Sequence, residues 1–262
     1  MISILSYNIL DGGVGRETEI ISTIKSSNPD IVLLQEVFDE DALSRFSKSL
    51  DMDYKFIIGN SKRNLGLMSK IPIAFCQTHH PFPPIRRAFV EARFEYEPGK
   101  YFHFFGVHLQ ALHGVVFEAW RLWEITIILR TIKCKISKKE PCLIAGDFNA
   151  IAPRDRVIKA AMPLYIKLIL FLQGWHIFKF ALKSILDNGF SDCYRFINKK
   201  EDGFTLPTNN PNARLDYFFA NKEMIANLKE CLVANQCEKS RKASDHYPIL
   251  TRFDFSFDDF LD

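Results

Sequence analysis

Residues Pro141–Ala150 read PCLIAGDFNA, a short apolar run that ends in an aspartate and an asparagine two residues apart. The four small or branched apolar residues Cys142–Ala145 lie between a proline and a glycine, which favours a buried β-strand over an amphipathic helix. Gly146 is expected to let the backbone turn sharply, and Asp147 and Asn149 are expected to project from one side because side chains alternate in extended chain. A carboxylate and an amide at a strand end could hold a phosphate and a water; alternatively, they only cap a turn.

Polar residues also end the two strands predicted near the N-terminus. Ile2–Ile9 alternates and ends in Asn8, whereas Asp30–Val37 is a continuous apolar run that ends in Gln35 and Glu36. An ionised glutamate at the end of a buried strand costs free energy unless it is paired or binds a metal. Glu36 therefore has two interpretations, a metal ligand or a sheet-edge glutamate paired with an arginine.

Imidazole groups lie at two further strand ends. Two alternating runs, AFVEARFEYE and YFHFFGVHLQ, predict an antiparallel hairpin whose second strand ends beyond His108. His108 is interpreted as a ligand-binding residue, with a satisfied core histidine as the alternative. Asp245 and His246 form a polar turn before the last strand, and a second carboxylate could fix the tautomer of this imidazole. Asp216 is surrounded in the sequence by apolar residues, so its carboxylate needs a partner. It is therefore the candidate for this second carboxylate.

Other strands and several helices are predicted between these segments. The spacing of apolar residues predicts helices at residues 16–25, 39–50 and 115–132. Strands are predicted at residues 54–58 and 64–73, the second broken by a serine and a proline. The chain therefore mixes helices and strands throughout.

The composition is that of a globular protein. Hydrophobic residues make up 47% of the 262 residues and charged residues 25%, which excludes disordered, collagen-like and fibrous classes. The length corresponds to one large domain or two small ones. The formal net charge of +3 is too small to indicate nucleic-acid binding by itself, because such binding depends on local clusters of Lys and Arg.

The cysteines and the N-terminus indicate a cellular compartment. The six cysteines show no Cys-x-x-Cys spacing and no pairing framework, so we expect reduced structural thiols and no zinc site. No basic segment or cleavage site precedes the first strand, so no signal peptide is expected. These features predict a cytoplasmic protein.

Residues 151–186 have the least regular pattern. Polar residues interrupt the apolar stretch well short of the roughly 18 apolar residues that a membrane span needs. We expect two short helices packed over the core. The alternative is an amphipathic segment that lies on a membrane surface.

The polar residues at the strand ends form a set with consistent chemistry. Carboxylates, amides and imidazoles predominate and no thiolate is included, which suits a hard cation such as Mg²⁺ or Mn²⁺. Mg²⁺ usually binds through one or two carboxylates together with a substrate phosphate, so Glu36 suffices as its main protein ligand. The set comprises Asn8, Glu36, His108, Asp147, Asn149, Asp216, Asp245 and His246.

Six short segments that contain this set resemble the endonuclease/exonuclease/phosphatase superfamily, the DNase I-like and exonuclease III-like metal-dependent phosphohydrolases. They follow the family's order and extend from Ser6 to Ile249, nearly the whole chain. The segments are SYNIL, LLQEV, GVHLQ, AGDFNA, RLDYFFA and SDHYPI.

The resemblance implies an α/β fold, a four-layered sandwich with two central mixed, largely antiparallel β-sheets flanked by helices. The site is expected at one edge, formed by strand-end loops. We expect a single domain over residues 1–262, with a helical insertion at about 151–186.

The resemblance also implies a role for each residue of the set. Glu36 would bind the divalent ion, with Asn8 and Asp245 near it. Asp147 would orient or deprotonate the attacking water, and Asn149 would hold a phosphate oxygen.

The two histidines would act on the phosphoryl group. His246, steered by Asp216, would stabilise its charge or act as the base, and whether Asp147 or His246 takes the proton stays open. His108 would hydrogen-bond the phosphate or assist the leaving oxygen. Together these groups would support in-line attack of water on a phosphate ester.

A phosphodiester in DNA or RNA is the first substrate hypothesis. Abasic-site enzymes of the superfamily usually carry a tyrosine at the position that resembles His108. His108 therefore weakens the hypothesis that the chain is an abasic-site enzyme. A set of basic residues could follow a nucleic-acid backbone or be scattered surface charges: Lys62, Arg63, Arg86, Arg87, Arg154, Arg156 and Lys159.

Two alternatives stay open at this point. A hydrolase of a phospholipid or small phosphoester is favoured if Leu164–Phe180 exposes an apolar face beside the site. A catalytically silent binding module on the same fold is disfavoured because every motif residue is present. No obligate protein partner is expected, and a membrane surface is the less favoured partner.

Overall fold

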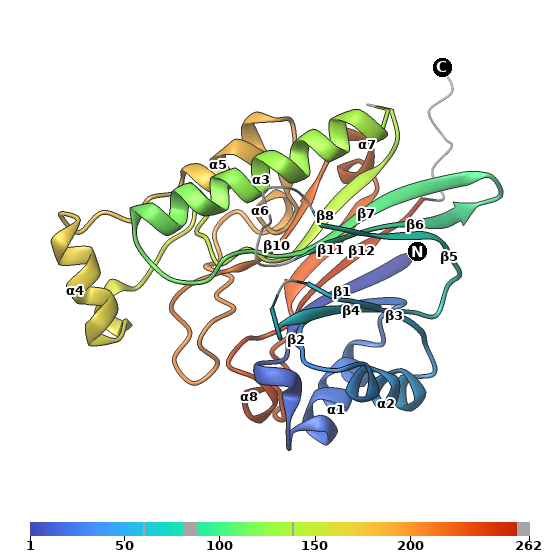
Figure 1. Cartoon of the computed structure of the whole chain (residues 1–262), viewed down its shortest axis with the longest axis horizontal. Coiled ribbons are helices and arrows are strands. Elements are labelled where there is room, and N and C mark those ends of the chain that lie inside the picture. Colours follow the sequence, from blue (N-terminus) through green and yellow to red (C-terminus); the bar gives the residue numbers. More distant parts are fainter. Residues whose placement is uncertain (60, 81–87, 138, 256–262) are drawn as a thin grey trace.

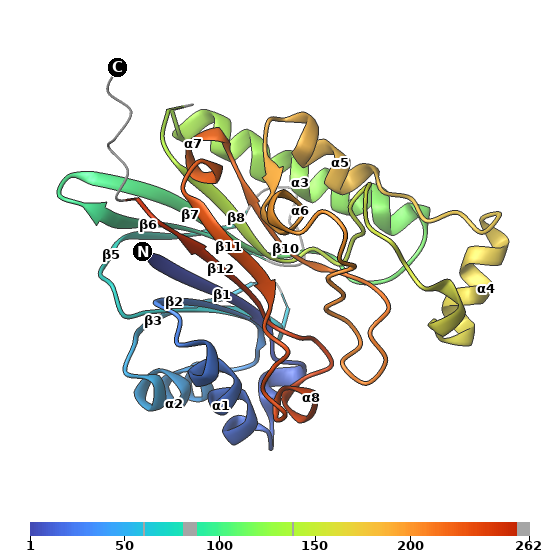
Figure 2. The same ribbon diagram turned by 180° about the vertical axis from the view of Figure 1, so that it is seen from behind.

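The computed structural model describes residues 1–59, 61–80, 88–137 and 139–255. Two six-stranded sheets lie face to face in its centre, and helices cover their outer faces, so the chain forms four layers (Figure 1). The view from behind shows the two helical layers on opposite sides of the sheets (Figure 2). The predicted four-layered α/β sandwich is confirmed.

The first sheet has the strand order β11-β12-β1-β2-β4-β3. Its central pair, β1 and β2, is parallel, and the other neighbours are antiparallel. The strands are β1 (Ile2–Asn8), β2 (Ile31–Val37), β3 (Asp53–Ile57), β4 (Asn64–Ser69), β11 (Leu228–Val233) and β12 (Ile249–Phe253).

The second sheet has the strand order β5-β6-β7-β8-β10-β9. Its central pair, β7 and β8, is parallel, and β6 and β7 form the predicted antiparallel hairpin. The strands are β5 (Ile73–His79), β6 (Phe89–Glu97), β7 (Lys100–His108), β8 (Cys142–Asp147), β9 (Ser191–Asp192) and β10 (Asp216–Ala220).

The helices lie mainly outside the sheets. Helices α1 and α2 cover the first sheet, and α3 and α5 cover the second (Figure 1). The helices are α1 (Glu17–Ser27), α2 (Glu40–Leu50), α3 (Val115–Lys135), α4 (Leu164–Leu172), α5 (Phe180–Asp187), α6 (Cys193–Ile197), α7 (Lys222–Ile225) and α8 (Ser240–Ala243).

Side-chain alternation in the central strands decides which layer each residue contacts. In β2, Ile31 and Leu33 belong to the apolar core between the two sheets, whereas Val32 and Leu34 belong to the core under the helices. Both faces of such a strand are buried, which is why the central strands read as continuous apolar runs.

The strand predicted at residues 64–73 is two strands of different sheets. β4 ends at Ser69, and β5 begins at Ile73 in the second sheet. The hydroxyl of Ser69 donates to the carbonyl of Ile71 at 2.6 Å and accepts from its backbone N–H at 3.1 Å. This local turn carries the chain from one sheet to the other.

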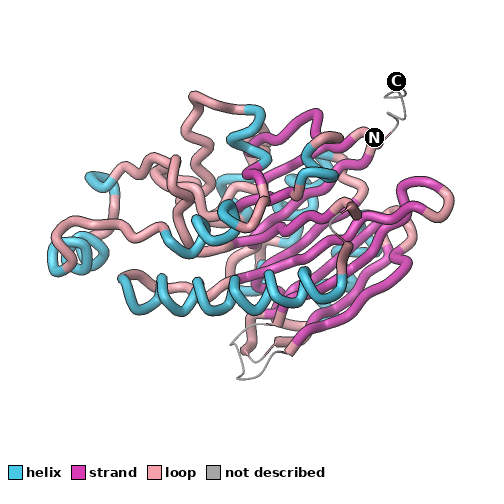
Figure 3. Tube along the Cα trace, turned by 90° about the horizontal axis from the view of Figure 1, so that it is seen from above, coloured by secondary structure: helices cyan, strands magenta, loops and turns pink. Residues whose placement is uncertain are grey.

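The two helices between residues 151 and 186 differ in how they pack. Helix α5 buries Ala181, Leu182 and Ile185 in the core beneath α3, as predicted. For α4 the prediction of core packing is wrong, because Leu170 is the one buried residue of this fully described helix. Helix α4 projects beyond the ends of the strands (Figures 1 and 3). Over the described residues, no helix has the length and apolarity required to cross a bilayer.

Candidate active site

Three neighbouring strands of the second sheet bring polar residues to one level. Asp147 ends β8, and its pairing partners are His108 in the parallel strand β7 and Asp216 in the antiparallel strand β10. All three side chains are buried. The register of the sheet therefore places side by side three residues that are far apart in the sequence.

The first sheet contributes residues from the opposite side. Asn8 ends β1, and Glu36 lies near the end of the neighbouring parallel strand β2. Asp245 and His246 lie in the loop that precedes β12. Ser244 fixes this loop, because its hydroxyl donates to the carbonyl of Asn8 at 2.6 Å and accepts from the backbone N–H of His246 at 3.1 Å.

The site residues converge on one carboxylate oxygen, Oδ2 of Asp147. The side-chain amides of Asn8 and Asn149 donate to it at 3.0 Å and 3.2 Å. The Nε2 atoms of His108 and His246 lie 3.4 Å and 4.0 Å from it. The other oxygen, Oδ1, accepts the backbone N–H of Asn149 at 2.8 Å. Four other predicted site residues thus surround a single acceptor oxygen.

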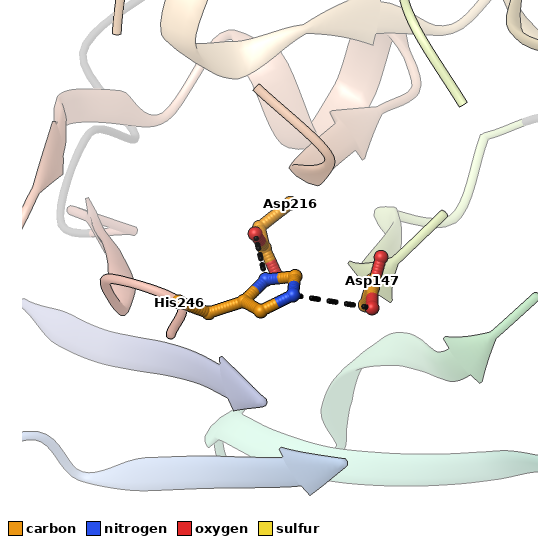
Figure 4. Close-up of side chains that lie close together, drawn as sticks. All are labelled: Asp147, Asp216 and His246. Atoms are coloured by element: carbon orange, nitrogen blue, oxygen red, sulfur yellow. Dashed lines mark hydrogen bonds and ion pairs between the residues drawn. The ribbon is translucent and has the colours of Figure 1, made fainter. Parts of the chain in front are cut away.

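The ring of His246 is held between two carboxylates (Figure 4). Its Nδ1 lies 2.9 Å from Oδ2 of Asp216, within hydrogen-bond distance. This hydrogen bond sets the orientation of the ring and leaves Nε2 facing Asp147 (Figure 4). The candidate pair Asp216 and His246 is therefore brought together.

The surroundings shift the pKa values of His246 and Asp147. Burial by itself lowers the pKa of His246, but the nearby carboxylates of Asp216 and Asp147 outweigh it and raise the pKa to about 10. Burial raises the pKa of Asp147 to about 6, although the charge of His246 opposes this shift. At pH 7 these values correspond to a protonated imidazole facing an ionised carboxylate.

Gly146 is required by the close contact of two strands. Its φ is 146°, and a Cβ atom at this position would lie 1.9 Å from the carbonyl oxygen of Val107 in β7. Strand β8 continues through Gly146 to Asp147, so the prediction of a sharp turn at this glycine is wrong. The missing side chain lets β7 and β8 pair up to the level of His108 and Asp147.

Two site residues have a left-handed backbone. The φ angle is 66° at Glu36 and 48° at Asn149, in a region that residues other than glycine rarely adopt. Glu36 lies at a bulge of β2, where the register with β4 shifts between Gln35 and Val37. A bulge interrupts the alternation of side chains and can re-aim one of them. Backbone strain of this kind is typical of functional sites.

The two oxygens of Glu36 have different surroundings. Oε2 accepts the backbone N–H of Asp11 at 2.9 Å and lies 3.4 Å from Nε of Arg63. Oε1 lies 3.9 Å from Nε2 of His108, on the side of Asp147. Asp11 was not predicted as a site residue, because the sequence places it in a turn without a distinctive spacing. Arg63 was predicted as a contact to a nucleic-acid backbone or a scattered surface charge, not as a partner of Glu36.

A second buried charged cluster at the start of β10 was also not predicted. The guanidinium of Arg214 is fully buried and pairs with the carboxylates of Asp155 and Asp192. Asp155 also accepts the hydroxyl of Tyr217 at 2.8 Å. Arg214 and Tyr217 flank Asp216 in the sequence, so the cluster fixes the backbone that carries Asp216. An arginine at the start of the segment RLDYFFA, next to a strand rich in aromatic residues, was its one sequence signal.

A cavity of about 560 Å³ opens beside the site. Asn149 and Asp245 line it on the side of the site, and Ile166, Leu206 and Phe178 contribute to a largely apolar remainder. The sequence predicted a helical insertion at about 151–186 but did not predict a cavity.

Comparison with known structures relates this geometry to solved proteins. An AP endonuclease from Archaeoglobus fulgidus has a TM-score of 0.76 and 17% identity, and the match covers 97% of this chain and 100% of that one. The 3′ phosphatase NExo from Neisseria, bound to a product DNA hairpin, has a TM-score of 0.75 and 17% identity, with coverage of 97% and 100%. An endonuclease/exonuclease/phosphatase from Beutenbergia cavernae has a TM-score of 0.69 and 20% identity, with coverage of 95% and 70%. These likenesses show a common fold.

Comparison at the level of sequence identifies the family. No curated protein matches the chain. A model of the Endonuclease/Exonuclease/phosphatase family matches residues 5–246, which include every residue of the convergent site. The chain therefore belongs to the Endonuclease/Exonuclease/phosphatase family and is a hydrolase of phosphoester bonds.

Proposed function

We propose that this hydrolase cleaves phosphodiesters with the help of a divalent cation, Mg²⁺ or Mn²⁺. The observation that carries the proposal is the convergence of Asn8, Asn149, His108 and His246 on one oxygen of Asp147. A carboxylate held in this way can position and deprotonate a water, and the surrounding donors can bind the phosphate that the water attacks.

The donors of the site fit a hard cation, in a family that is metal-dependent. One oxygen of Glu36 is held by the protein and the other is on the side of the site. Within the described part of the chain, Oδ1 of Asp216 is buried without a hydrogen-bond partner. Oxygen donors of this kind suit Mg²⁺ or Mn²⁺, and we assign Glu36 as the main ligand with Asp245 and Asn8 near it. The cation would neutralise charge that develops on the phosphoryl oxygens.

An alternative cation position is formed by Asp147, Asp216 and His246. One ligand atom from each of these residues lies within 4.8 Å of the others. The hydrogen bond between Asp216 and His246 already occupies Nδ1 of the ring, and this favours Glu36 as the main ligand. Asn8 contributes chiefly by position, because Oδ1 accepts the N–H of Leu10 and Nδ2 donates to Asp147.

We assign Asp147 as the base and His246 as the donor to the phosphate. The pKa of Asp147 near 6 leaves its carboxylate ionised at neutral pH and able to accept a proton. The pKa of His246 near 10 leaves its ring protonated, so Nε2 donates a charged hydrogen bond. Asn149 and His108 would hold the remaining phosphate oxygens or the leaving oxygen.

Nucleic acid is the substrate class that we propose first. Among the similar structures, one is described as an AP endonuclease and another as a 3′ phosphatase bound to a DNA hairpin. The basic residues considered for a nucleic-acid backbone are dispersed in this chain. Arg63 lies at the site, Arg156 forms an exposed ion pair, and Arg86 and Arg87 lie outside the described residues.

A lipid phosphoester is the second candidate substrate. The cavity beside Asn149 and Asp245 is lined largely by apolar side chains. Such a cavity accommodates an ester with an apolar group better than a charged backbone. Helix α4 forms one wall of this cavity. The sequence favoured a phospholipid or small phosphoester as substrate if residues Leu164–Phe180, which include α4, exposed an apolar face beside the site.

We also propose that residues 1–262 act as one domain, with 151–186 as an insertion that shapes the cavity. Strands from both ends of the chain pair in the first sheet, β12 with β1, which supports this division. A cytoplasmic location is part of the proposal, because all six cysteines are free thiols.

The proposal is tested by hydrolysis assays with and without Mg²⁺ on plasmid, single-stranded DNA, RNA, a generic phosphodiester and lipid vesicles. We expect cation-dependent cleavage of at least one phosphodiester, and loss of that cleavage in His246→Ala. Circular dichroism must show that the variant is folded. Unchanged cleavage by folded His246→Ala, or full activity in a chelator, would reject the assigned site.

A further inference from the structure

Helix α4 exposes an unusual apolar surface for a helix of a globular domain. Leu164, Tyr165, Leu168, Phe171 and Leu172 are between 58% and 83% exposed. Solvent-exposed faces of helices in globular proteins are normally polar, and an extended exposed apolar patch marks an interaction surface. The helix projects away from the sheets rather than lying on them (Figures 1 and 3).

The exposed residues of α4 form one continuous face. At about 100° per residue they span an arc of about 120° around the helix axis. The opposite side carries Ile166, Ile169 and Leu170, which line the cavity beside the site, and Tyr165 at the edge of the exposed face lines it as well. The helix therefore has an inner apolar side that faces the cavity and an outer apolar side that faces solvent.

The segment that contains α4 carries charged residues of one sign. Residues 156–186 contain no aspartate or glutamate, although the chain as a whole has 34 basic and 31 acidic residues. Lys159 and Lys167 donate to the backbone carbonyls of Trp175 and Ala160, and neither has a carboxylate partner among the described residues. The segment also contains Lys179 and two basic residues that are paired with carboxylates outside it, Arg156 with Asp202 and Lys183 with Asp187.

The aromatic residues of the segment have the character of interfacial anchors. Tyr165, Phe171 and Trp175 are exposed, and the rings of Phe171 and Trp175 lie edge to face with centroids 6.4 Å apart. Tyrosine and tryptophan are enriched where protein meets the headgroup region of a bilayer. An apolar face bordered by lysines is the pattern of a helix that lies in the plane of such a surface.

We propose that α4 together with Trp175 docks this enzyme onto an anionic lipid bilayer. At nine residues α4 is about 14 Å long and so lies in the interface rather than spanning it. The absence of acidic residues over 156–186 favours an anionic bilayer as the occupant. Docking holds the cavity that the inner side of α4 lines close to the membrane, whichever phosphodiester is cleaved.

The experiment is vesicle co-sedimentation of the full chain. Vesicles of phosphatidylcholine with about 30% phosphatidylserine are compared with vesicles of phosphatidylcholine alone. We expect tighter binding to the anionic vesicles, and at least tenfold weaker binding for the double variant Leu168→Ser/Phe171→Ser. The matched control is Ile58→Ser/Phe196→Ser, which removes two exposed apolar side chains elsewhere and should bind as the wild type does.

A second pair of variants isolates the charge. Lys159→Gln/Lys167→Gln should weaken binding to the anionic vesicles, whereas Lys48→Gln/Lys222→Gln on other faces should not. Fluorescence of the wild type should shift to shorter wavelength on binding, and Trp175→Phe should remove most of the shift. This readout does not require any variant of α4 itself to fold.

The outcomes separate docking from catalysis. His246→Ala should bind vesicles as tightly as the wild type, and Leu168→Ser/Phe171→Ser should cleave a soluble phosphodiester normally. Docking is rejected if the wild type binds no vesicles, or if both serine pairs bind equally well. A dimer that Leu168→Ser/Phe171→Ser dissociates, without vesicle binding by the wild type, would assign the face to a second copy of the chain and also overturn the proposal.

Discussion

Two buried clusters of charged side chains meet at the start of β10, and they differ in the balance of their charges. In the Arg214 cluster, the guanidinium of Arg214 faces Asp155 and Asp192, and Arg195 adds a second positive charge on Asp155 at 2.8 Å. This cluster contains two cations and two anions, and each charge has an oppositely charged partner.

The Asp147 cluster is anionic by comparison. Glu36, Asp147 and Asp216 outnumber the protonated ring of His246, even with Arg63 beside Glu36. Buried charges are stable when they are paired, so an excess of carboxylates in a buried site indicates that a cation completes it. The comparison separates a cluster that holds the fold from one that is arranged to bind a ligand.

The largest effect is expected from breaking the balanced cluster. Arg214→Leu leaves Asp192 buried without its cation and Asp155 with Arg195 alone, which should lower the free energy of unfolding by about 3–5 kcal/mol. Urea denaturation measures this change. The control is Arg156→Leu, which removes an exposed ion pair and should cost less than about 1 kcal/mol. A similar small cost for Arg214→Leu would show that the cluster does not stabilise the fold.

Removing a charge from the anionic cluster should reduce activity strongly and stability little. Glu36→Gln keeps the size of the side chain and its acceptor for Asp11, so the free energy of unfolding should change by less than about 1 kcal/mol. The rate of phosphodiester hydrolysis should fall by about 10³-fold, equivalent to about 4 kcal/mol in the transition state. Steady-state kinetics measure the rate, and a variant as active as the wild type would remove Glu36 from the site.

Binding of the cation should stabilise the protein through the same residue. At about 100 times its Kd, Mg²⁺ should add about 2.7 kcal/mol to the free energy of unfolding of the wild type. Glu36→Gln should show little of this gain. Thermal or urea unfolding with and without Mg²⁺ measures it. An equal gain in both proteins would place the cation on Asp147, Asp216 and His246 instead.

The stability of the metal-free protein should also depend on pH. The pKa of His246 is raised from 6.5 to about 10, so its contribution is fully present below pH 6.5 and is lost as the pH rises through about 10. The difference in unfolding free energy between the wild type and His246→Ala should shrink by at most about 1.4 kcal/mol per pH unit over this range. A flat difference between pH 7 and 10 would contradict the raised pKa, and His80→Ala should follow the wild type.

Asp147 should act at lower pH than His246, and with the opposite sign to a carboxylate whose pKa is lowered on folding. Its raised pKa means that the folded state retains a proton that the unfolded chain has already lost, so its contribution declines as the pH rises from about 4 to about 6. Activity should rise through the same range because the ionised form is the base. The measurement is a pH–rate profile beside urea unfolding, and activity independent of pH below 6 would exclude Asp147 as the base.

The sequence by itself determined the strands and the chemistry at their ends. Continuous apolar runs that stop at Glu36 and Asp147 can be read directly, because a strand buried on both faces has no polar alternation to obscure its end. The order of the six segments, taken with the family resemblance, then predicted the layered fold and the site residues. These properties depend on local patterns, which a sequence contains in full.

The tertiary structure decided how those ends meet and what lies around them. That His108, Asp147 and Asp216 share one level depends on strand register, and Gly146 matters because another strand approaches it, so neither can be read from local spacing. The pairing of Arg214 with Asp155 joins residues 59 positions apart. Helix α4 has the composition of a core helix, and only the position of the other layers shows that nothing in the described chain covers its outer face. Burial is a property of the assembled layers, so the sequence alone could not show that α4, predicted to pack over the core, lies exposed. The exposed face of this helix is the surface that we propose docks onto a membrane.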